Sequence, residues 1–353
     1  MPGTPSSVHR QESVRRRPHL CWQPERPHAF GPTIGEVEEL RTLHDDQVFL
    51  RREALEHGYR DEDLVHALRD GLIARIRHGA YTFTDVWNSA DEIARHSLRA
   101  HAVLRSHRAP VALSHTSAAV EHGLRLFKPD LSKVHVLTRG ERLARTTGDV
   151  VYHRGDYADG DFTLVNGRWA VEPVLAGLQT ASLVDVASGM VVLDSVIDLE
   201  LGSLERIHGG LRRIGGHPFS RRLQITVRLV REGSNSVGES LSRHLMWSQH
   251  LPEPELQFEV RDEWGRLIGI TDFAWPGHGL LGEFDGMTKY GRLRKKGETP
   301  GEAVEREKKR EDHLREETGW LMVRIIWSQL FTPGATAARI RRQLERGRAL
   351  RAS

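Results

Sequence analysis

The sequence predicts a multidomain α/β protein; two observations point to this class, and a third, the cysteine count, bears on its compartment. At 353 residues the chain exceeds what one hydrophobic core usually supports, so two or three domains are expected. Helical and strand periodicities alternate along most of the chain, which is typical of α/β and mixed folds. The single cysteine, Cys21, excludes an internal disulfide and a thiolate zinc site, which fits a reducing cytosol.

The charge balance favours local basic surfaces over a large overall charge. The formal net charge is only +3, but arginine is abundant and 20 histidines are present, so nucleic acid is a candidate partner. No apolar run approaches the ~20 residues of a membrane helix. The cluster Arg15-Arg16-Arg17 is followed by Pro18 and polar residues instead of the apolar core of a signal peptide. We therefore expect a cytoplasmic protein with no membrane partner.

The amino-terminal part predicts a disordered leader followed by a winged helix-turn-helix domain at residues 34–88. Residues 1–33 combine Pro, Ser, Arg and His without a helical or strand period, as in a disordered leader or an artificially extended start. Three short helices are then expected, near residues 34–43, 50–57 and 61–70. Asp61 is the N-cap candidate of the third helix, Gly71 ends it, and the alternating segment 72–83 predicts a hairpin.

Basic side chains on the third helix and on the hairpin are candidates for contacts with DNA phosphates. These are Arg60, His66, Arg69, Arg75, Arg77 and His78. The acids Asp61, Glu62 and Asp63 at the start of the same helix oppose strong binding there. A protein-interaction domain is therefore the alternative interpretation.

Residues 89–232 predict a mixed α+β middle domain in which we find no chemical motif. Its expected elements are a helix near 90–106, strands near 133–137 and 150–153, and an apolar helix near 173–187. Residues 233–353, after a Gly-Ser-Asn-Ser break, predict an α/β domain that ends in a helix. Its expected elements are a helix at 237–250, strands at 255–261, 267–275 and 280–286, a charged helix at 302–317 and a strand at 321–327. The last strand is almost wholly apolar, as in a central strand covered on both faces.

Three acids in this last domain form the sharpest chemical signal. A hairpin turn at residues 276–279 places Asp272 directly opposite Glu283, and the strand period of two places Asp285 on the same face. Opposed carboxylates repel, so the arrangement requires a cation, a shifted pKa or bulk water. Oxygen-only ligands favour Mg²⁺ or Mn²⁺, which predicts a metal site at these acids. The alternative is a solvated sheet face, with Phe273 and Phe284 packed on the other side.

Further residues around the acids are candidates for the same site or for DNA phosphates. Glu239, on the preceding helix, could bind the ion or a metal-bound water, or could be an exposed acid of the first helical turn. The basic residues after the acids are Lys289, Arg292, Arg294, Lys295 and Lys296. On the charged helix Arg306 and Arg310 share a face. The alternative there is a solvated surface with the ion pairs Glu302–Arg306 and Glu305–Lys309.

The order of these acids resembles a known nuclease motif. Glu239 on a helix, Asp272 at a strand end and then Glu283-Phe284-Asp285-Gly286 resemble the PD-(D/E)XK nuclease superfamily, particularly its branch similar to the very-short-patch repair endonuclease. The resemblance covers residues 234–331. It implies a restriction-endonuclease-like α/β domain, a mixed sheet flanked by helices, and Mg²⁺-dependent hydrolysis of phosphodiesters.

The resemblance also implies roles for individual residues. Asp272 and Glu283 would bind the metal, and Glu239 would be the auxiliary acid on the helix. Asp285 stands where the superfamily commonly has a lysine, which departs from the pattern. Lys289, just beyond, is the candidate for the missing cation.

The amino-terminal part is similar to a different family. The runs Arg52-Glu53-Ala54-Leu55 and Arg77-His78-Gly79-Ala80-Tyr81 resemble the winged-helix domain of AbiEi-type antitoxins, with coverage of about residues 34–83. The run 113–119, Leu-Ser-His-Thr-Ser-Ala-Ala, is similar to the segment that commonly follows in those proteins. Its His115 is either a structural or a catalytic histidine. AbiEi antitoxins are DNA-binding repressors of type IV toxin–antitoxin pairs, which implies DNA and a toxin-like protein as partners.

Two hypotheses of function follow from these patterns. The first is a DNA-binding protein with a Mg²⁺-dependent PD-(D/E)XK-like endonuclease domain. The second is a non-catalytic transcriptional regulator, or an AbiEi-like antitoxin, that carries a degenerate nuclease fold.

Overall fold

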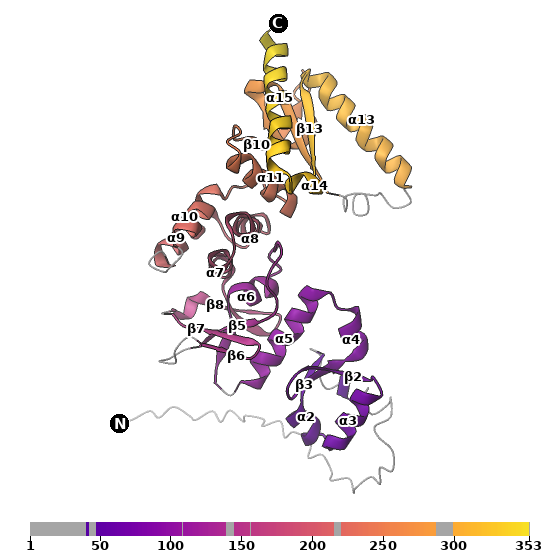
Figure 1. The fold of residues 1–353 in the computed structure, drawn as a ribbon, viewed down its shortest axis with the longest axis vertical. Helices are drawn as coiled ribbons and strands as arrows, with labels where there is room; N and C mark the ends of the chain where they lie inside the picture. The colour runs from indigo at the N-terminus through magenta and orange to yellow at the C-terminus, as the bar shows by residue number, and fades with distance from the viewer. Residues whose placement is uncertain are drawn as a thin grey trace, which may run out of the picture.

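The computed structural model of the chain describes residues 40–41, 47–107, 109–138, 145–155, 157–214, 220–286 and 299–352. These residues form a mixed α/β protein with sheets of three, six and four strands. The three sheets follow one another along the long axis of the molecule, each with helices of its own (Figure 1). The mixture of helices with three separate sheets agrees with the predicted multidomain α/β class. Among the described helices, none combines the length and the apolar character needed to cross a bilayer.

The first sheet is antiparallel and has the order β1-β3-β2. Its strands are β1 (Val48–Leu50), β2 (Ile73–Arg77) and β3 (Ala80–Phe83), and its helices are α2 (Arg51–Glu56) and α3 (Asp61–Arg69). Phe49, Leu64 and Phe83 form the centre of its core. Gly79 turns the hairpin with a φ of 71°, a left-handed conformation that favours glycine. The predicted order of two helices and a hairpin is confirmed.

Two details of this region differ from the prediction. Residues 48–50 form a strand that pairs with β3, so the helix expected from residue 50 begins at Arg51. The N-cap of α3 is Arg60 and not Asp61, and the Asp63 carboxylate accepts a hydrogen bond from the Arg60 backbone N–H at 2.8 Å. The helix expected near residues 34–43 lies outside the described residues except for Leu40 and Arg41, which are helical.

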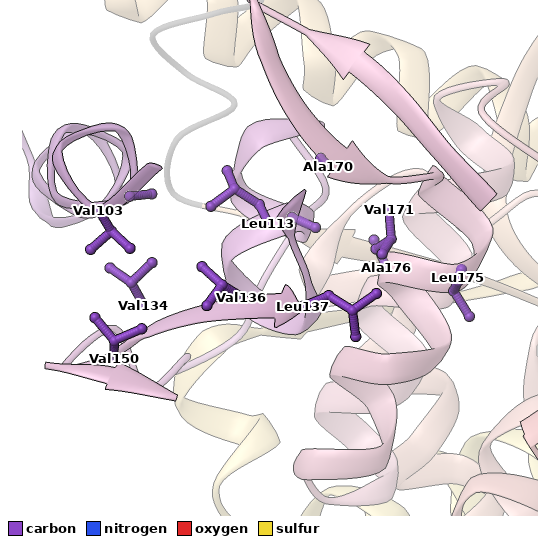
Figure 2. Close-up of a cluster of buried hydrophobic side chains, with 12 residues drawn as sticks. Val103, Leu113, Val134, Val136, Leu137, Val150, Ala170, Val171, Leu175 and Ala176 are labelled. Atoms are coloured by element: carbon purple, nitrogen blue, oxygen red, sulfur yellow. The ribbon is translucent and has the colours of Figure 1, made fainter. Parts of the chain in front are cut away.

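The second sheet has the order β6-β7-β5-β4-β9-β8 and is mixed. Its strands are β4 (Val111–Leu113), β5 (Val134–Thr138), β6 (Arg145–Thr147), β7 (Val150–His153), β8 (Phe162–Val165) and β9 (Arg168–Val171). The helices α4 (Thr84–Ser89) and α5 (Glu92–Ser106) lead into it, and α6 (His115–Glu121) follows β4. Figure 2 shows its core, in which Val103 of α5 faces Val134 and Val150 of the sheet.

A helical layer joins the second sheet to the third. It consists of α7 (Pro173–Leu183), α8 (Val186–Asp198), α9 (Leu204–Ile214) and α10 (Ser220–Leu229). The short 3-10 turn η1 (Asp159–Asp161) lies earlier in the chain, between β7 and β8. The expectation of one continuous apolar helix near residues 173–187 is wrong. The chain breaks after Leu183, and the Asp185 carboxylate caps a new helix by accepting a hydrogen bond from the Ser188 N–H at 2.8 Å.

The third sheet has the order β10-β11-β12-β13, with the last pair parallel and the others antiparallel. Its strands are β10 (Glu255–Arg261), β11 (Leu267–Trp275), β12 (Leu280–Asp285) and β13 (Leu321–Ile326), and η2 (Pro276–His278) links β11 to β12. The surrounding helices are α11 (Val237–Ser248), α13 (Pro300–Thr318), α14 (Trp327–Leu330) and α15 (Pro333–Ala352). The expectation that β13 is a central strand is wrong, because it lies at the edge of the sheet; both of its faces are nevertheless covered, which explains its apolar sequence.

A buried ion pair connects the helical layer to the third sheet. Asp194 of α8, only 1% exposed, accepts hydrogen bonds from Arg243 Nη1 of α11 at 2.9 Å and from Ser240 Oγ at 2.7 Å. The backbone N–H of Arg231 donates a third hydrogen bond, at 3.2 Å. Burial raises the pKa of the Asp194 carboxyl, whereas Arg243 and Ser240 act in the opposite direction. The carboxylate is therefore compensated by partners from two segments, α11 and the linker that precedes it.

We expect Asp194→Ala to destabilise the protein by about 3–5 kcal/mol, because it leaves the buried guanidinium of Arg243 without its partner. Chemical denaturation measures this change. Glu253→Ala is the matched control, since it removes an exposed ion pair with Arg231 and should cost about 1 kcal/mol or less. Equal losses in the two variants would contradict the assigned role of the buried pair.

Candidate functional site

The predicted hairpin register around the acids is confirmed. Phe273 pairs with Gly282 and Trp275 pairs with Leu280, as predicted. The ladder ends at Phe273, and Asp272 and Glu283 stand at the next position beyond it. Gly279 closes the turn with a φ of 56°. Turn length and strand period were sufficient to predict this register.

The two faces of the hairpin separate as the sequence predicts. Phe273 and Phe284 lie in the core that α11 and α15 cover. On the opposite face, Ala274 and Leu281 pack against Leu314 of α13. Glu283 and Asp285 share the parity of Leu281, and the contacts of Glu283 with Arg310 place it on the face that α13 covers.

Glu283 is neutralised by two arginines and not by bulk water. Its side chain accepts a hydrogen bond from Arg310 Nη2 of α13, and Arg324 Nη2 of β13 lies 3.4 Å from its second oxygen. Burial raises the pKa of Glu283, while the two guanidiniums oppose that shift. At 6% exposure, Glu283 shows that the solvated-face interpretation is wrong at this position.

Arg324 is the central cation of this face, and it is a residue that the sequence reasoning missed. It is the cross-strand register partner of Glu283, and its guanidinium lies 3.6 Å from Asp285. It also reaches two acids of α13, Glu307 at 3.3 Å and Glu311 at 2.9 Å. The available signal was a single charged residue in an otherwise apolar strand.

The acids are arranged differently from a preassembled metal site. Asp272 Oδ2 accepts a hydrogen bond from the Phe284 backbone N–H at 2.8 Å, so it caps the end of the β11–β12 ladder. Among the described residues, no three of Asp272, Glu283, Asp285 and Glu239 bring ligand atoms within 4.8 Å of one another. The donor set still suits a hard cation, because carboxylate oxygens are the ligands that Mg²⁺ and Mn²⁺ prefer.

Glu239 stabilises the start of its own helix, α11, through hydrogen bonds. Its carboxylate accepts hydrogen bonds from the Asn235 N–H at 2.9 Å and from the Ser236 hydroxyl at 2.7 Å. At 3% exposure, it is not the exposed acid that the alternative interpretation required. Gly238, next to it, lets α11 approach β12 closely, since an added Cβ would overlap the ring of Phe284.

The basic residues predicted to contact DNA in residues 233–353 fall into two groups, those outside the described residues and those on α13. Those that follow the acids lie outside the described residues, namely Lys289, Arg292, Arg294, Lys295 and Lys296. On α13 the expected ion pair of Glu305 and Lys309 is present at 2.8 Å. Arg306 is half-buried, and Arg310 is turned into the acid cluster with Glu307 at 2.6 Å.

The amino-terminal basic residues form two groups. Arg60, Arg69, Arg75 and His78 are exposed. Arg77 is half-buried, and its guanidinium binds Asp149 of the turn between β6 and β7 at 3.1 Å. His66 is half-buried beside Arg69, with 2.7 Å between Nδ1 and Arg69 Nη2. The exposed group is therefore the surface that remains open to a phosphate backbone.

His115, which the sequence left as either structural or catalytic, lies in a cluster of three histidines. Its partners are His135 of β5 and His153 of β7, and the ligand atoms of the three rings lie within 4.8 Å of one another. Burial lowers the pKa of both His135 and His153 to about 4. The sequence carried only weak signals for these partners, as each is a lone histidine in an apolar strand.

Comparisons with known proteins leave the family open. No model of a known protein family matches the sequence. No curated protein matches it either. The chain is similar to the solved structure of the RV2827C protein from Mycobacterium tuberculosis, at 19% identity and a TM-score of 0.37, over 66% of this chain and 85% of that chain. A likeness of this strength says nothing about function.

We expect Gly238→Ala to destabilise the third sheet by about 1–3 kcal/mol, because the new methyl group meets the buried ring of Phe284. Thermal and chemical denaturation measure the change. Gly334→Ala in α15 is the control, since nothing lies within 4 Å of its Cβ position and alanine favours a helix by up to ~1 kcal/mol. A neutral effect of Gly238→Ala would refute the close approach of α11 to β12.

Proposed function

We propose that this protein binds DNA and carries a Mg²⁺-dependent, PD-(D/E)XK-like endonuclease domain at its carboxyl end. The observation that supports this most is the pairing of Phe273 with Gly282, since Asp272 and Glu283 follow directly at the end of that ladder and Asp285 lies two residues further along β12. The mixed sheet with helices on both faces agrees with the fold that the nuclease resemblance implies. Residues 233–353 would form this domain.

The chemistry assigns a role to each group. Asp272, Glu283 and Asp285 would hold the divalent ion, which when bound lowers the pKa of water and neutralises phosphoryl oxygens. Glu239 would act indirectly, because it fixes the start of α11. Lys289 stays the candidate from the sequence for the missing cation.

Arg324 offers a second source for that cation. Asp285 occupies the position of the lysine in the nuclease motif, and the Arg324 guanidinium lies 3.6 Å from it. A guanidinium at this position can stabilise negative charge that develops on a phosphodiester, which is the task of a cation in such a site. Arg324 is thus proposed to supply from β13 what the motif lacks on β12.

The amino-terminal region would recruit the DNA. Residues 34–88 are proposed to act as a winged helix, with α3 and the β2–β3 hairpin side by side against the duplex. Arg60, Arg69, Arg75 and His78 are exposed there and would contact phosphates. The acids Asp61 and Glu62 on α3 would limit the affinity and keep the contact mainly electrostatic.

One observation favours a second candidate function, a non-catalytic regulator or an AbiEi-like antitoxin with a degenerate nuclease fold. The positive charge beside Glu283 is already supplied by Arg310 and Arg324. In this alternative the arginines replace the metal permanently, and the domain binds DNA or a toxin-like partner without cutting.

We expect the double variant Asp272→Asn, Glu283→Gln to lose Mg²⁺- or Mn²⁺-dependent nicking of supercoiled plasmid by about 100-fold or more, because both proposed metal ligands lose their charge. Gel electrophoresis of the plasmid over time measures this rate. The control variant Asp312→Asn, Glu316→Gln removes two exposed acids of α13 and should nick like the parent protein.

The same proteins separate the two candidate functions. Parental activity in the Asp272, Glu283 double variant would rule the acid site out. Calorimetry with Mn²⁺ then decides between cutting and regulation: an ion that binds the parent protein and not the double variant supports the nuclease, and no such ion together with salt-sensitive DNA binding supports the regulator.

We expect Arg75→Ala to weaken binding to duplex DNA uniformly across sequences and to reduce the slope of log affinity against log salt by about 0.9, the loss of one phosphate contact. Fluorescence anisotropy at several salt concentrations measures the slope. Arg261→Ala is the control, since it removes an exposed arginine of β10 that pairs with Glu259. An unchanged slope in Arg75→Ala would argue against the hairpin as a DNA-binding element.

A further inference from the structure

Three histidines from three different elements meet in the second sheet. His115 begins α6 directly after β4, His135 lies on β5, and His153 ends β7. Nδ1 of His135 and Nε2 of His153 lie 2.8 Å apart, and the ring centroids of His115 and His153 lie 3.6 Å apart. The three rings thus direct nitrogen atoms into one small volume.

The backbone fixes the positions of these rings. In the parallel pair β5–β7, Leu137 is the register partner of His153 and Val151 is that of His135, so both histidines lie on one face. The Ser114 N–H donates to the His135 carbonyl at 3.0 Å, which ties the start of α6 to β5. Two of the three ligands therefore lie on sheet backbone, which holds ligands more accurately than a loop does, and the third follows directly from the strand β4.

His115 adopts a special backbone conformation that the surroundings maintain. Its φ is 49°, in the left-handed region that residues other than glycine rarely occupy. Its backbone N–H donates to Gln179 Oε1 at 3.0 Å, and its Nδ1 lies 3.1 Å from Ser114 Oγ. Gln179 in turn donates to the Tyr157 hydroxyl at 3.0 Å. Such outer contacts orient the imidazole of a metal ligand.

The charge state of the cluster suits a cation. In the described part of the chain, the rings of His135 and His153 hydrogen-bond to each other and not to a carboxylate, so a bound metal ion would take the place of the proton that they share. Burial disfavours the charged imidazolium in both rings and lowers their pKa to about 4. A neutral imidazole carries one nitrogen lone pair that can bind a metal.

We propose that His115, His135 and His153 form a binding site for a transition-metal ion of the zinc class. Imidazole nitrogens suit Zn²⁺ and related ions, whereas Mg²⁺ prefers oxygen. Three protein ligands leave a fourth tetrahedral position for water or for a ligand from outside the chain. The ion would link the β4–α6 turn to the β5–β7 pair. This site is distinct from the proposed nuclease site in position and in metal preference.

The experiment is a calorimetric titration of the full-length protein with Zn²⁺ alone, together with visible absorption after addition of Co²⁺. We expect one equivalent of Zn²⁺ and the intense Co²⁺ bands of a tetrahedral site. His135→Gln and His153→Gln should each weaken Zn²⁺ binding by about 100-fold or more, because each removes a ligand and keeps a polar side chain of similar size. His208→Gln is the control, as His208 is exposed on α9 and should not change the affinity.

The outcomes decide the proposal in either direction. Zn²⁺ binding that stays unchanged in both glutamine variants overturns it, and so does the absence of stoichiometric binding by the parent protein. If a variant fails to fold, the parent protein alone is decisive. A tetrahedral Co²⁺ spectrum together with a rise in Tm on addition of Zn²⁺ supports the site, and a spectrum of hydrated octahedral Co²⁺ overturns it.

Discussion

The structure depends on the requirement that a buried charge be paired. Asp194 and Arg243 meet where α8 packs on α11, and this contact joins the helical layer to the third sheet. Either charge alone would be costly in an apolar interface, whereas the pair with its added hydrogen bonds is tolerated. The domain boundary predicted at residue 233 lies between these two residues in the sequence. The two regions are therefore coupled through side chains even though their backbones belong to different layers.

The same requirement organises the face of the third sheet beneath α13. Glu283 lies on a strand and beneath a helix, so water cannot solvate it well. Arg310 and Arg324 approach it from a helix and from the neighbouring strand. Arg310 and Arg324 thus supply the positive charge that the clustered acids require. A divalent ion at this site would have to compete with these arginines for the carboxylates. This competition links the fold of the site to its proposed chemistry.

Local patterns predicted local structure well. The bounds of β10 and β11 and the register of the hairpin after β11 followed from a period of two and a short turn, because both are properties of neighbouring residues. Contacts between distant segments did not follow. Arg324 reaches Glu283 only after the chain has passed through α13, and His135 and His153 meet His115 only through the order of the second sheet. Periodicity contains no information on such pairings.

The parallel pairing of β12 with β13 has a consequence for how the chain is completed. Two parallel neighbouring strands require a crossover connection, and α13 is part of the connection between β12 and β13. β13 is therefore the last strand of the third sheet to be synthesised. During synthesis Glu283 leaves the ribosome well ahead of both guanidiniums that neutralise it. β12 therefore cannot bury Glu283 with its neutralising partners until α13 and β13, which carry the two arginines, have followed in the chain.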